Sequence, residues 1–87
     1  MINDRKKIDV QIEYCVPCDY SDHALKVSRE LLKKFQHDIN SLTLITGSKG
    51  IFDIKINDKL IFSKKKLNRF PDTGEVSELL KKKWFND

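Results

Sequence analysis

The hydrophobic pattern of this chain changes period on either side of two closely spaced cysteines. Before Cys15, apolar and polar residues alternate over residues 8–14, which is typical of a strand with one buried face. After Cys18, apolar residues recur at steps of three and four positions as far as Phe35, which indicates an amphipathic helix. The chain therefore predicts a strand, a short segment that holds both cysteines, and a helix. The residues that carry the helical spacing are Ala24, Leu25, Val27, Ser28, Leu31, Leu32 and Phe35.

The predicted helix has residue types that favour helix termini at both ends. Ser21 or Asp22 is expected to accept hydrogen bonds from the amides of the first turn. Lys33 and Lys34 place positive charge where it favours the C-terminal end of a helix. Pro17 is compatible with a first helical turn, so the pattern leaves the first residue of the helix open.

The rest of the chain predicts three more strands and a second helix. Three of the four residues at 42–45 are apolar, and a strand–helix–strand order with so long a crossover favours parallel, right-handed pairing with the first strand. Residues 51–56 and 60–62 predict an antiparallel hairpin that turns at Asn57 and Asp58. Helical spacing returns over residues 73–85, with Asp72 or Thr73 as the expected N-cap. The predicted fold is therefore α/β, with a parallel unit extended by a hairpin.

Length and composition favour one small globular domain over residues 1–87. The chain has 87 residues, 39% of them hydrophobic and 34% charged, and this balance excludes disordered and fibrous classes. Charged residues stand near the N-terminus where a signal peptide would need an apolar stretch, and no window has the length of a membrane span. We therefore expect a cytoplasmic protein without a membrane partner.

The net charge of +4 comes mostly from lysine, especially from the runs at 64–66 and 81–83. Such a balance can favour an anionic surface as a partner. Lysine runs in small proteins are usually solvated faces, so we do not expect a nucleic-acid partner.

The Cys15-Val16-Pro17-Cys18 motif carries the candidate chemistry. In the cytosol thiols are kept reduced, so a close cysteine pair there indicates a catalytic, redox-sensing or metal-binding role. Two-residue spacing suits both a small redox ring and half of a zinc site. Because this pair follows a strand and precedes a helix, its context favours a thioredoxin-like redox centre.

A helix N-terminus would favour the reactive form of this pair. Its amides and the positive end of its dipole stabilise a thiolate relative to a thiol, and the thiolate is the attacking species. The second cysteine can then resolve the mixed disulfide within the same chain. Pro17 limits the freedom of the segment, whereas a carboxylate at Asp19 near Cys18 would oppose ionisation.

Two alternatives to a redox centre follow from the residue types. A zinc site would draw on Cys15, Cys18, His23 and His37, but the two histidines stand fourteen residues apart on one predicted helix. This separation is about 21 Å along the axis, so zinc would have to be shared between two chains. The cysteines could also be two small buried hydrophobes near a strand end.

Four further residues have simpler structural explanations than functional ones. His23 is expected to face solvent in the first helical turn rather than act as a base. Phe52, Phe62 and Trp84 follow the apolar periodicities and are expected in the core or at its edge, not as a nucleotide-stacking platform.

Several short stretches share their order and spacing with a known family. They are Ile12-Glu13-Tyr14-Cys15-x-x-Cys18-x-Tyr20, Ala24, Gly50-x-Phe52-Asp53-Ile54, Ser63-Lys64 and Arg69-Phe70-Pro71. Together they resemble the selenoprotein W-like family, also called Rdx. The resemblance implies a thioredoxin-like two-layer sandwich of βαβββα order, with a four-stranded mixed sheet and helices packed on it. Cys15 matches the family's first cysteine, and Cys18 matches the selenocysteine-or-cysteine position. In selenium-containing relatives this second position is the more reactive one, whereas thioredoxin attacks with its first cysteine. Both Cys15 and Cys18 therefore stay candidates for the attacking sulfur.

The chain also departs from this family pattern. Asp19 stands where the family often has Gly, His23 where it often has Arg, and Gln36 where it commonly has Pro. In thioredoxins a cis-proline faces the cysteine pair; here Gly50 and Ile51 would take that place. These differences imply a less acidic thiol and a different docking of partner backbones.

We therefore expect a thiol-disulfide redox protein in which the Cys15–Cys18 pair exchanges with glutathione, thioredoxin-type donors or client proteins, without a bound cofactor. One alternative is a non-catalytic protein-binding module in which the pair acts as a redox switch. The others are a structural pair that shares zinc between chains and a basic adaptor for an anionic surface.

Overall fold

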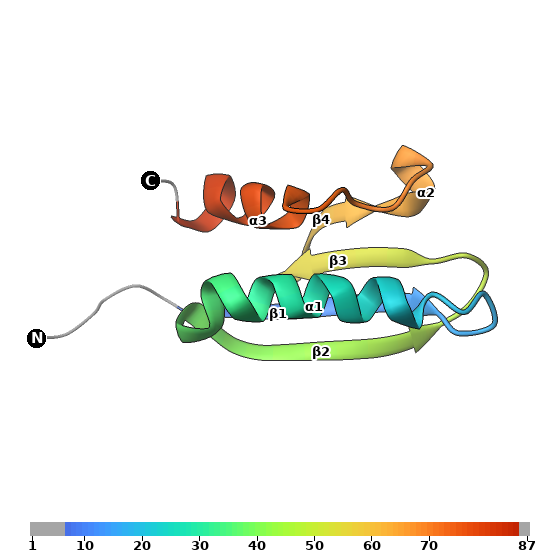
Figure 1. The fold of residues 1–87 in the computed structure, drawn as a ribbon, viewed down its shortest axis with the longest axis horizontal. Helices are drawn as coiled ribbons and strands as arrows, with labels where there is room; N and C mark the ends of the chain where they lie inside the picture. The colour runs from blue at the N-terminus through green and yellow to red at the C-terminus, as the bar shows by residue number, and fades with distance from the viewer. Residues whose placement is uncertain (1–6, 86–87) are drawn as a thin grey trace, which may run out of the picture.

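The computed structural model describes residues 7–85. Its elements are β1 (Ile8–Cys15), α1 (Ser21–Phe35), the 3-10 turn η1 (Gln36–Asp38), β2 (Ile39–Gly47), β3 (Phe52–Ile56), β4 (Lys59–Ser63), α2 (Lys64–Leu67), α3 (Glu75–Leu80) and the π-helical turn η2 (Lys81–Phe85). The four strands form one mixed sheet in the order β2-β1-β3-β4, shown in Figure 1. β1 pairs in parallel with β2 and antiparallel with β3, and β3 pairs antiparallel with β4. The predicted α/β fold of βαβββα order is thus confirmed.

The alternation in β1 places its apolar side chains in the core. Ile8, Val10 and Ile12 are at most 1% exposed, and they lie on the sheet face that α1 and α3 cover. Phe52 and Phe62 are buried and Trp84 packs at the edge of the core, as predicted. The core residues are Ile8, Val10, Ile12, Ala24, Val27, Leu31, Phe35, Phe52, Ile54, Ile56, Phe62, Val76, Leu80 and Phe85.

The predicted hairpin is formed by β3 and β4 and turns at Asn57 and Asp58. Both turn residues have positive φ, 49° and 68°. Positive φ at both central positions matches the twist of a two-residue hairpin, and Asn and Asp tolerate this conformation better than other side-chain-bearing residues. The turn chemistry of these two residues therefore closes the hairpin.

The expected cap of α1 is wrong. Ser21 and Asp22 lie inside the first turn, the N-cap position is Tyr20, and no side chain caps it. The carbonyl of Tyr20 instead accepts the N–H of Ala24 at 3.1 Å. The left-handed backbone at Asp19, with φ 65°, turns the chain toward the helix before Ser21, so the helix starts one position earlier than side-chain capping predicts.

The expected cap of the C-terminal helix is also wrong. α3 begins at Glu75 after an N-cap at Gly74, rather than after Asp72 or Thr73. Gly74 has φ 84°, a conformation that costs glycine little. The carbonyl of Asp72 accepts the N–H of Glu75 at 3.0 Å, so a tight turn leads into the helix. The carboxylate of Glu30 on α1, rather than a residue next to the helix start, accepts the first-turn N–H of Ser77 at 3.1 Å.

Local pattern also missed one short helix and part of a strand. Residues 64–67 form α2, which ends at Asn68 in the left-handed conformation. β2 runs from Ile39 to Gly47, beyond the apolar stretch at 42–45, because backbone pairing with β1 extends through its polar residues. Within residues 7–85, no helix is both long and apolar enough to cross a membrane.

Candidate functional site

Both cysteines lie at the end of β1, where backbone hydrogen bonds hold the chain to two neighbours. The N–H of Cys15 donates to the carbonyl of Ile51 at 2.9 Å, and the carbonyl of Cys15 accepts the N–H of Tyr20 at 3.2 Å. The N–H of Val16 donates to the carbonyl of Gly47 at 3.0 Å. The end of β2 and the segment before β3 therefore fix the start of the cysteine loop.

Residues 16–20 form a turn that brings the two predicted site residues together. The N–H of Asp19 donates to the carbonyl of Val16 at 2.9 Å. Cys15 and Cys18 form a disulfide with an S–S distance of 2.04 Å and Cα atoms 5.3 Å apart. Asp19 has φ 65°, in the left-handed region that suits glycine and that Asp tolerates.

The two cysteines differ sharply in exposure. Cys15 is 0% exposed, whereas Cys18 is exposed together with its neighbours Val16 and Pro17. Val16 has 49% of its surface accessible to solvent. An incoming thiol or disulfide can therefore reach Cys18 along an open, partly apolar loop, while Cys15 lies beneath it.

Ile51 lies beside Cys15, at the place where thioredoxins have a cis-proline. No peptide bond within residues 7–85 is cis. Ile51 also lies tightly against Gly47: a Cβ on Gly47 would come within 2.7 Å of Ile51 Cγ2 and 2.9 Å of Glu13 Oε2. Real Cβ atoms do not approach so closely, so any side chain at this position would force Ile51 or Glu13 to move.

An aromatic cluster of Tyr20, His23, Phe52 and Phe70 adjoins the cysteine loop. The rings of His23 and Phe70 are stacked, with centroids 3.6 Å apart and planes 4° from parallel. Tyr20 and Phe52 meet Phe70 edge to face at 4.8 and 5.3 Å. His23 is exposed as predicted, yet its ring is fixed, so the first turn of α1 is joined to the loop at residues 68–74.

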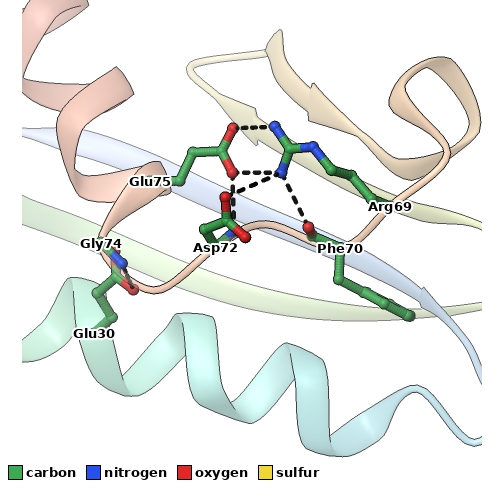
Figure 2. Close-up of polar contacts among 6 residues, drawn as sticks. All are labelled: Glu30, Arg69, Phe70, Asp72, Gly74 and Glu75. Carbon is green, nitrogen blue, oxygen red and sulfur yellow. Dashed lines mark hydrogen bonds and ion pairs between the residues drawn. The ribbon is translucent and has the colours of Figure 1, made fainter.

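The loop at residues 68–74 is anchored by charged groups on two elements. Figure 2 shows the guanidinium of Arg69 facing the carboxylates of Glu75 and Asp72; Arg69 donates to both oxygens of Glu75 at 2.7 and 2.8 Å. The hydrogen bonds from Arg69 lower the pKa of Glu75 from 4.5 to about 2. Glu30 on α1 accepts the N–H of Gly74 at 3.1 Å. Phe70 is therefore held against His23 from both sides of its loop.

Lys64 places a positive charge over this aromatic cluster. Its Nζ lies 5.3 Å from the ring centroid of Phe70 and 5.6 Å from that of Tyr20. Attraction between an ammonium group and an aromatic face favours this arrangement. The first lysine of the run at 64–66 is thus part of the surroundings of the site rather than of a purely solvated face.

The structure does not bring together the four residues of the zinc alternative. Among residues 7–85, no group of three or more His, Cys, Asp and Glu side chains is placed to hold a metal ion. His23 stacks on Phe70, and His37 lies in η1, after the far end of α1. Zinc binding would therefore need ligands from a second chain.

The sequence matches the Rdx family over residues 9–82. The chain belongs to the Rdx family. Migration and invasion enhancer 1 of Bos taurus is 28% identical over 75 residues, and the Mus musculus protein of the same name is 28% identical over 76 residues. Each alignment covers 86% of this chain and 64% of the relative, so this Rdx chain spans 64% of the length of these two relatives.

Two solved structures have the same fold as this Rdx protein. The crystal structure of a selenoprotein W-related protein from Vibrio cholerae has a TM-score of 0.86 and 26% sequence identity, and the match covers 94% of this chain and 100% of that one. A structure of a Bordetella parapertussis protein has a TM-score of 0.80 and 23% sequence identity, and the match covers 87% of this chain and 96% of that one. This second likeness bears on the fold alone. The expected thioredoxin-like, selenoprotein W-like fold is thus confirmed.

Sequence reasoning missed the part of the site that comes from the C-terminal third of the Rdx chain. Arg69 and Phe70 were noted only as part of the family resemblance, and Glu30 carried no signal beyond its exposed position on a predicted helix. The contacts between Glu30 and Ser77, at 2.6 Å, and between His23 and Phe70 each join residues 47 positions apart. Periodicity within one element cannot predict such pairs.

Replacing Gly47 by Ala is expected to lower the free energy of unfolding by about 1–3 kcal/mol, because the added Cβ forces Ile51 or Glu13 to move. Urea unfolding with the disulfide intact measures the change. Thr46→Ala, at the exposed neighbouring position, is the control and should stay within about 0.5 kcal/mol. A Gly47→Ala variant as stable as the control would show that the side chains of Ile51 and Glu13 move aside without cost.

The Arg69–Glu75 pair should make stability depend on pH. Because the folded state lowers the pKa of Glu75 from 4.5 to about 2, the stabilisation is complete above pH 4.5 and is lost as the pH falls toward 2. Glu75→Gln should cost about 1 kcal/mol or less at pH 7, since both side chains are partly exposed, and should flatten the pH profile.

Urea midpoints measured from pH 2 to 7 test this pair. Glu78→Gln, an exposed carboxylate on the same helix, is the matched control and should retain the wild-type slope. A Glu75→Gln variant that keeps the full wild-type pH dependence would contradict the assigned role.

Proposed function

We propose that this Rdx protein is a thiol-disulfide redox protein in which Cys18 exchanges with external sulfur and Cys15 resolves the mixed disulfide. The observation that supports it is the unequal exposure of a bonded pair: Cys15 is 0% exposed and Cys18 is exposed. Attack requires that the incoming sulfur reach the target in line with the breaking bond, so accessibility selects the sulfur. In selenium-containing relatives the second position is expected to be the more reactive one, which agrees with this choice, whereas thioredoxin attacks with its first cysteine.

The proposed exchange transfers two electrons and balances in two steps. The Cys18 thiolate attacks a partner disulfide, a Cys18–partner S–S bond forms, and the other partner sulfur leaves as a thiolate that takes up a proton. Cys15 then loses its proton to solvent and attacks Cys18 Sγ, which forms the Cys15–Cys18 bond and releases the second partner thiol. The cysteine pair is oxidised and the partner disulfide is reduced; glutathione, a thioredoxin-type donor or a client protein can run these steps in either direction.

The surroundings of the loop support such an exchange. Cys18 stands two positions before the N-cap of α1, and the amides at a helix N-terminus point toward a group placed there. The Cys15 backbone is bonded to Ile51 and Tyr20, so the resolving sulfur stays beneath Cys18 throughout. Asp19 follows Cys18 directly in the sequence, and a carboxylate close to the sulfur would oppose thiolate formation by its charge.

The aromatic cluster favours a second candidate function. Exposed Val16 and Pro17 share the cysteine loop with Tyr20, whose ring packs on Phe70, and such a surface suits a protein partner. In this alternative the disulfide switches binding on or off with little turnover.

Single-cysteine variants test which sulfur exchanges. With oxidised glutathione, Cys15→Ser should take up one glutathionyl group, while Cys18→Ser should react at least about 10-fold more slowly because its remaining thiol is buried. Intact-mass measurement against time gives both rates, and the same reaction in denaturant, where both variants should react alike, is the control. A Cys18→Ser variant that reacts as fast as Cys15→Ser would reverse the assignment, and two unreactive variants would exclude the redox function.

A further inference from the structure

β2 is an edge strand without the usual protection against pairing. It lies at one end of the strand order, and among the strands of residues 7–85 only β1 pairs with it. Its nine residues, Ile39–Gly47, include no charged side chain in a chain that is 34% charged. Natural edge strands are usually blunted by lysine, proline, bulges or a covering segment. Beyond an irregularity near Ile39, the register of β2 is regular to Gly47, so this edge can accept another strand.

Exposed leucines lie along the same edge on the helix-covered side. Leu42 and Leu44 pair with the core residues Val10 and Ile12, so their side chains share the face that α1 covers, and Leu44 is 38% exposed. On α1, Leu25 and Leu32 are 55% and 43% exposed. We call Leu25, Leu32, Leu42 and Leu44 the β2-edge surface.

Helix geometry places the two α1 leucines above β2. Residues seven apart lie two turns apart on the same side of a helix, so Leu25 and Leu32 form one stripe. The opposite flank of α1 carries His23 and Glu30, which contact Phe70 and the α3 residue Ser77. α3 lies over the β3–β4 half of the sheet in Figure 1, so the leucine stripe faces the β2 side.

A second copy of this chain fits the β2-edge surface in both layers at once. Strands pair about 4.8 Å apart, and α1 packs over both β1 and β2. Two copies with paired β2 strands would therefore hold their α1 helices about 10 Å apart, within the usual distance for packed helices. A lone peptide strand would cover the backbone edge but would leave Leu25 and Leu32 without a helix to contact.

Charge also favours a two-fold arrangement. Antiparallel β2 strands require antiparallel α1 helices, which sets the first turn of one helix beside the last turn of the other. The first turn carries Asp22 and the last turn carries Lys33, both on the solvent side of α1, and antiparallel helix dipoles attract. The uncharged strands between them introduce no repulsion.

We infer that two copies of this chain associate through antiparallel β2–β2 pairing, with a two-fold axis near Thr43, the midpoint of β2. The four-stranded sheets join into one of eight strands, and the leucines of the two β2-edge surfaces pack against each other. Because Gly47 at the end of β2 is bonded to Val16, the two cysteine loops lie at opposite ends of this dimer. Cys18 stays accessible in both copies, so the inference does not depend on the proposed redox function.

Sedimentation velocity of the full chain over about 1 µM to 500 µM tests the dimer. The expected mass rises from 10.2 kDa toward twice that value. Leu44→Lys and Leu32→Lys should each raise the dissociation constant at least about 10-fold, because each places a charged side chain against the leucines of the other copy. Leu67→Lys, at a 48% exposed leucine on α2, is the matched control and should change nothing.

Hydrogen exchange and circular dichroism complete this test. The amides of residues 41–45 should gain protection as concentration rises in the wild type and in Leu67→Lys, but not in Leu44→Lys. Unchanged circular dichroism would show that the variants fold. A wild type that is monomeric throughout would leave the edge to solvent or to a different partner and would overturn the inference, as would a dimer that neither Leu44→Lys nor Leu32→Lys weakens.

Discussion

The pairing of β1 with a strand on each side is the interaction on which the rest of the structure depends. Ile12 stands opposite Leu44 of β2 and Ile54 of β3, and its side chain is fully buried. A slip of one residue would turn the apolar side chains of β1 to the opposite face. It would also remove the bond from Cys15 to Ile51, so one register determines both the core and the position of the buried sulfur.

This register explains why the two cysteines of one short motif are so different. Cys15 belongs to the strand and shares its burial, whereas Cys18 belongs to a turn that leaves the sheet and is exposed. The left-handed residue Asp19 returns the chain so that Cys18 covers Cys15. The strand thus provides a fixed resolving sulfur, and the turn provides an accessible one. Charged and aromatic contacts from the loop at 68–74 hold the start of α1 beside them.

The elements that a short hydrophobic period defines could be predicted from the sequence. The alternation before Cys15, the helical spacing up to Phe35 and the Asn57–Asp58 turn each depend on neighbouring residues, and the fold follows from their order. Helix starts could not be predicted from cap-forming side chains, because positive φ at Asp19 and Gly74 sets them instead.

The site was predictable only in its local part. The motif identified the cysteine pair, and the comparison with thioredoxins placed Gly50 and Ile51 opposite it. The sequence did not identify the stack of His23 on Phe70 or the role of Glu30, because these contacts form only when distant segments pack. The exposure of each cysteine likewise depends on where β1 ends, a boundary that periodicity does not define to one residue.

Equilibrium oxidation of the wild-type chain across a series of reduced-to-oxidised glutathione ratios tests the redox role of the pair most directly. The fraction of Cys15–Cys18 disulfide is measured by alkylating the free thiols and determining the intact mass of the products. The proposed redox role predicts one two-electron transition within the glutathione series. A pair that stays reduced at every ratio, or that binds zinc stoichiometrically instead of forming the disulfide, would contradict it.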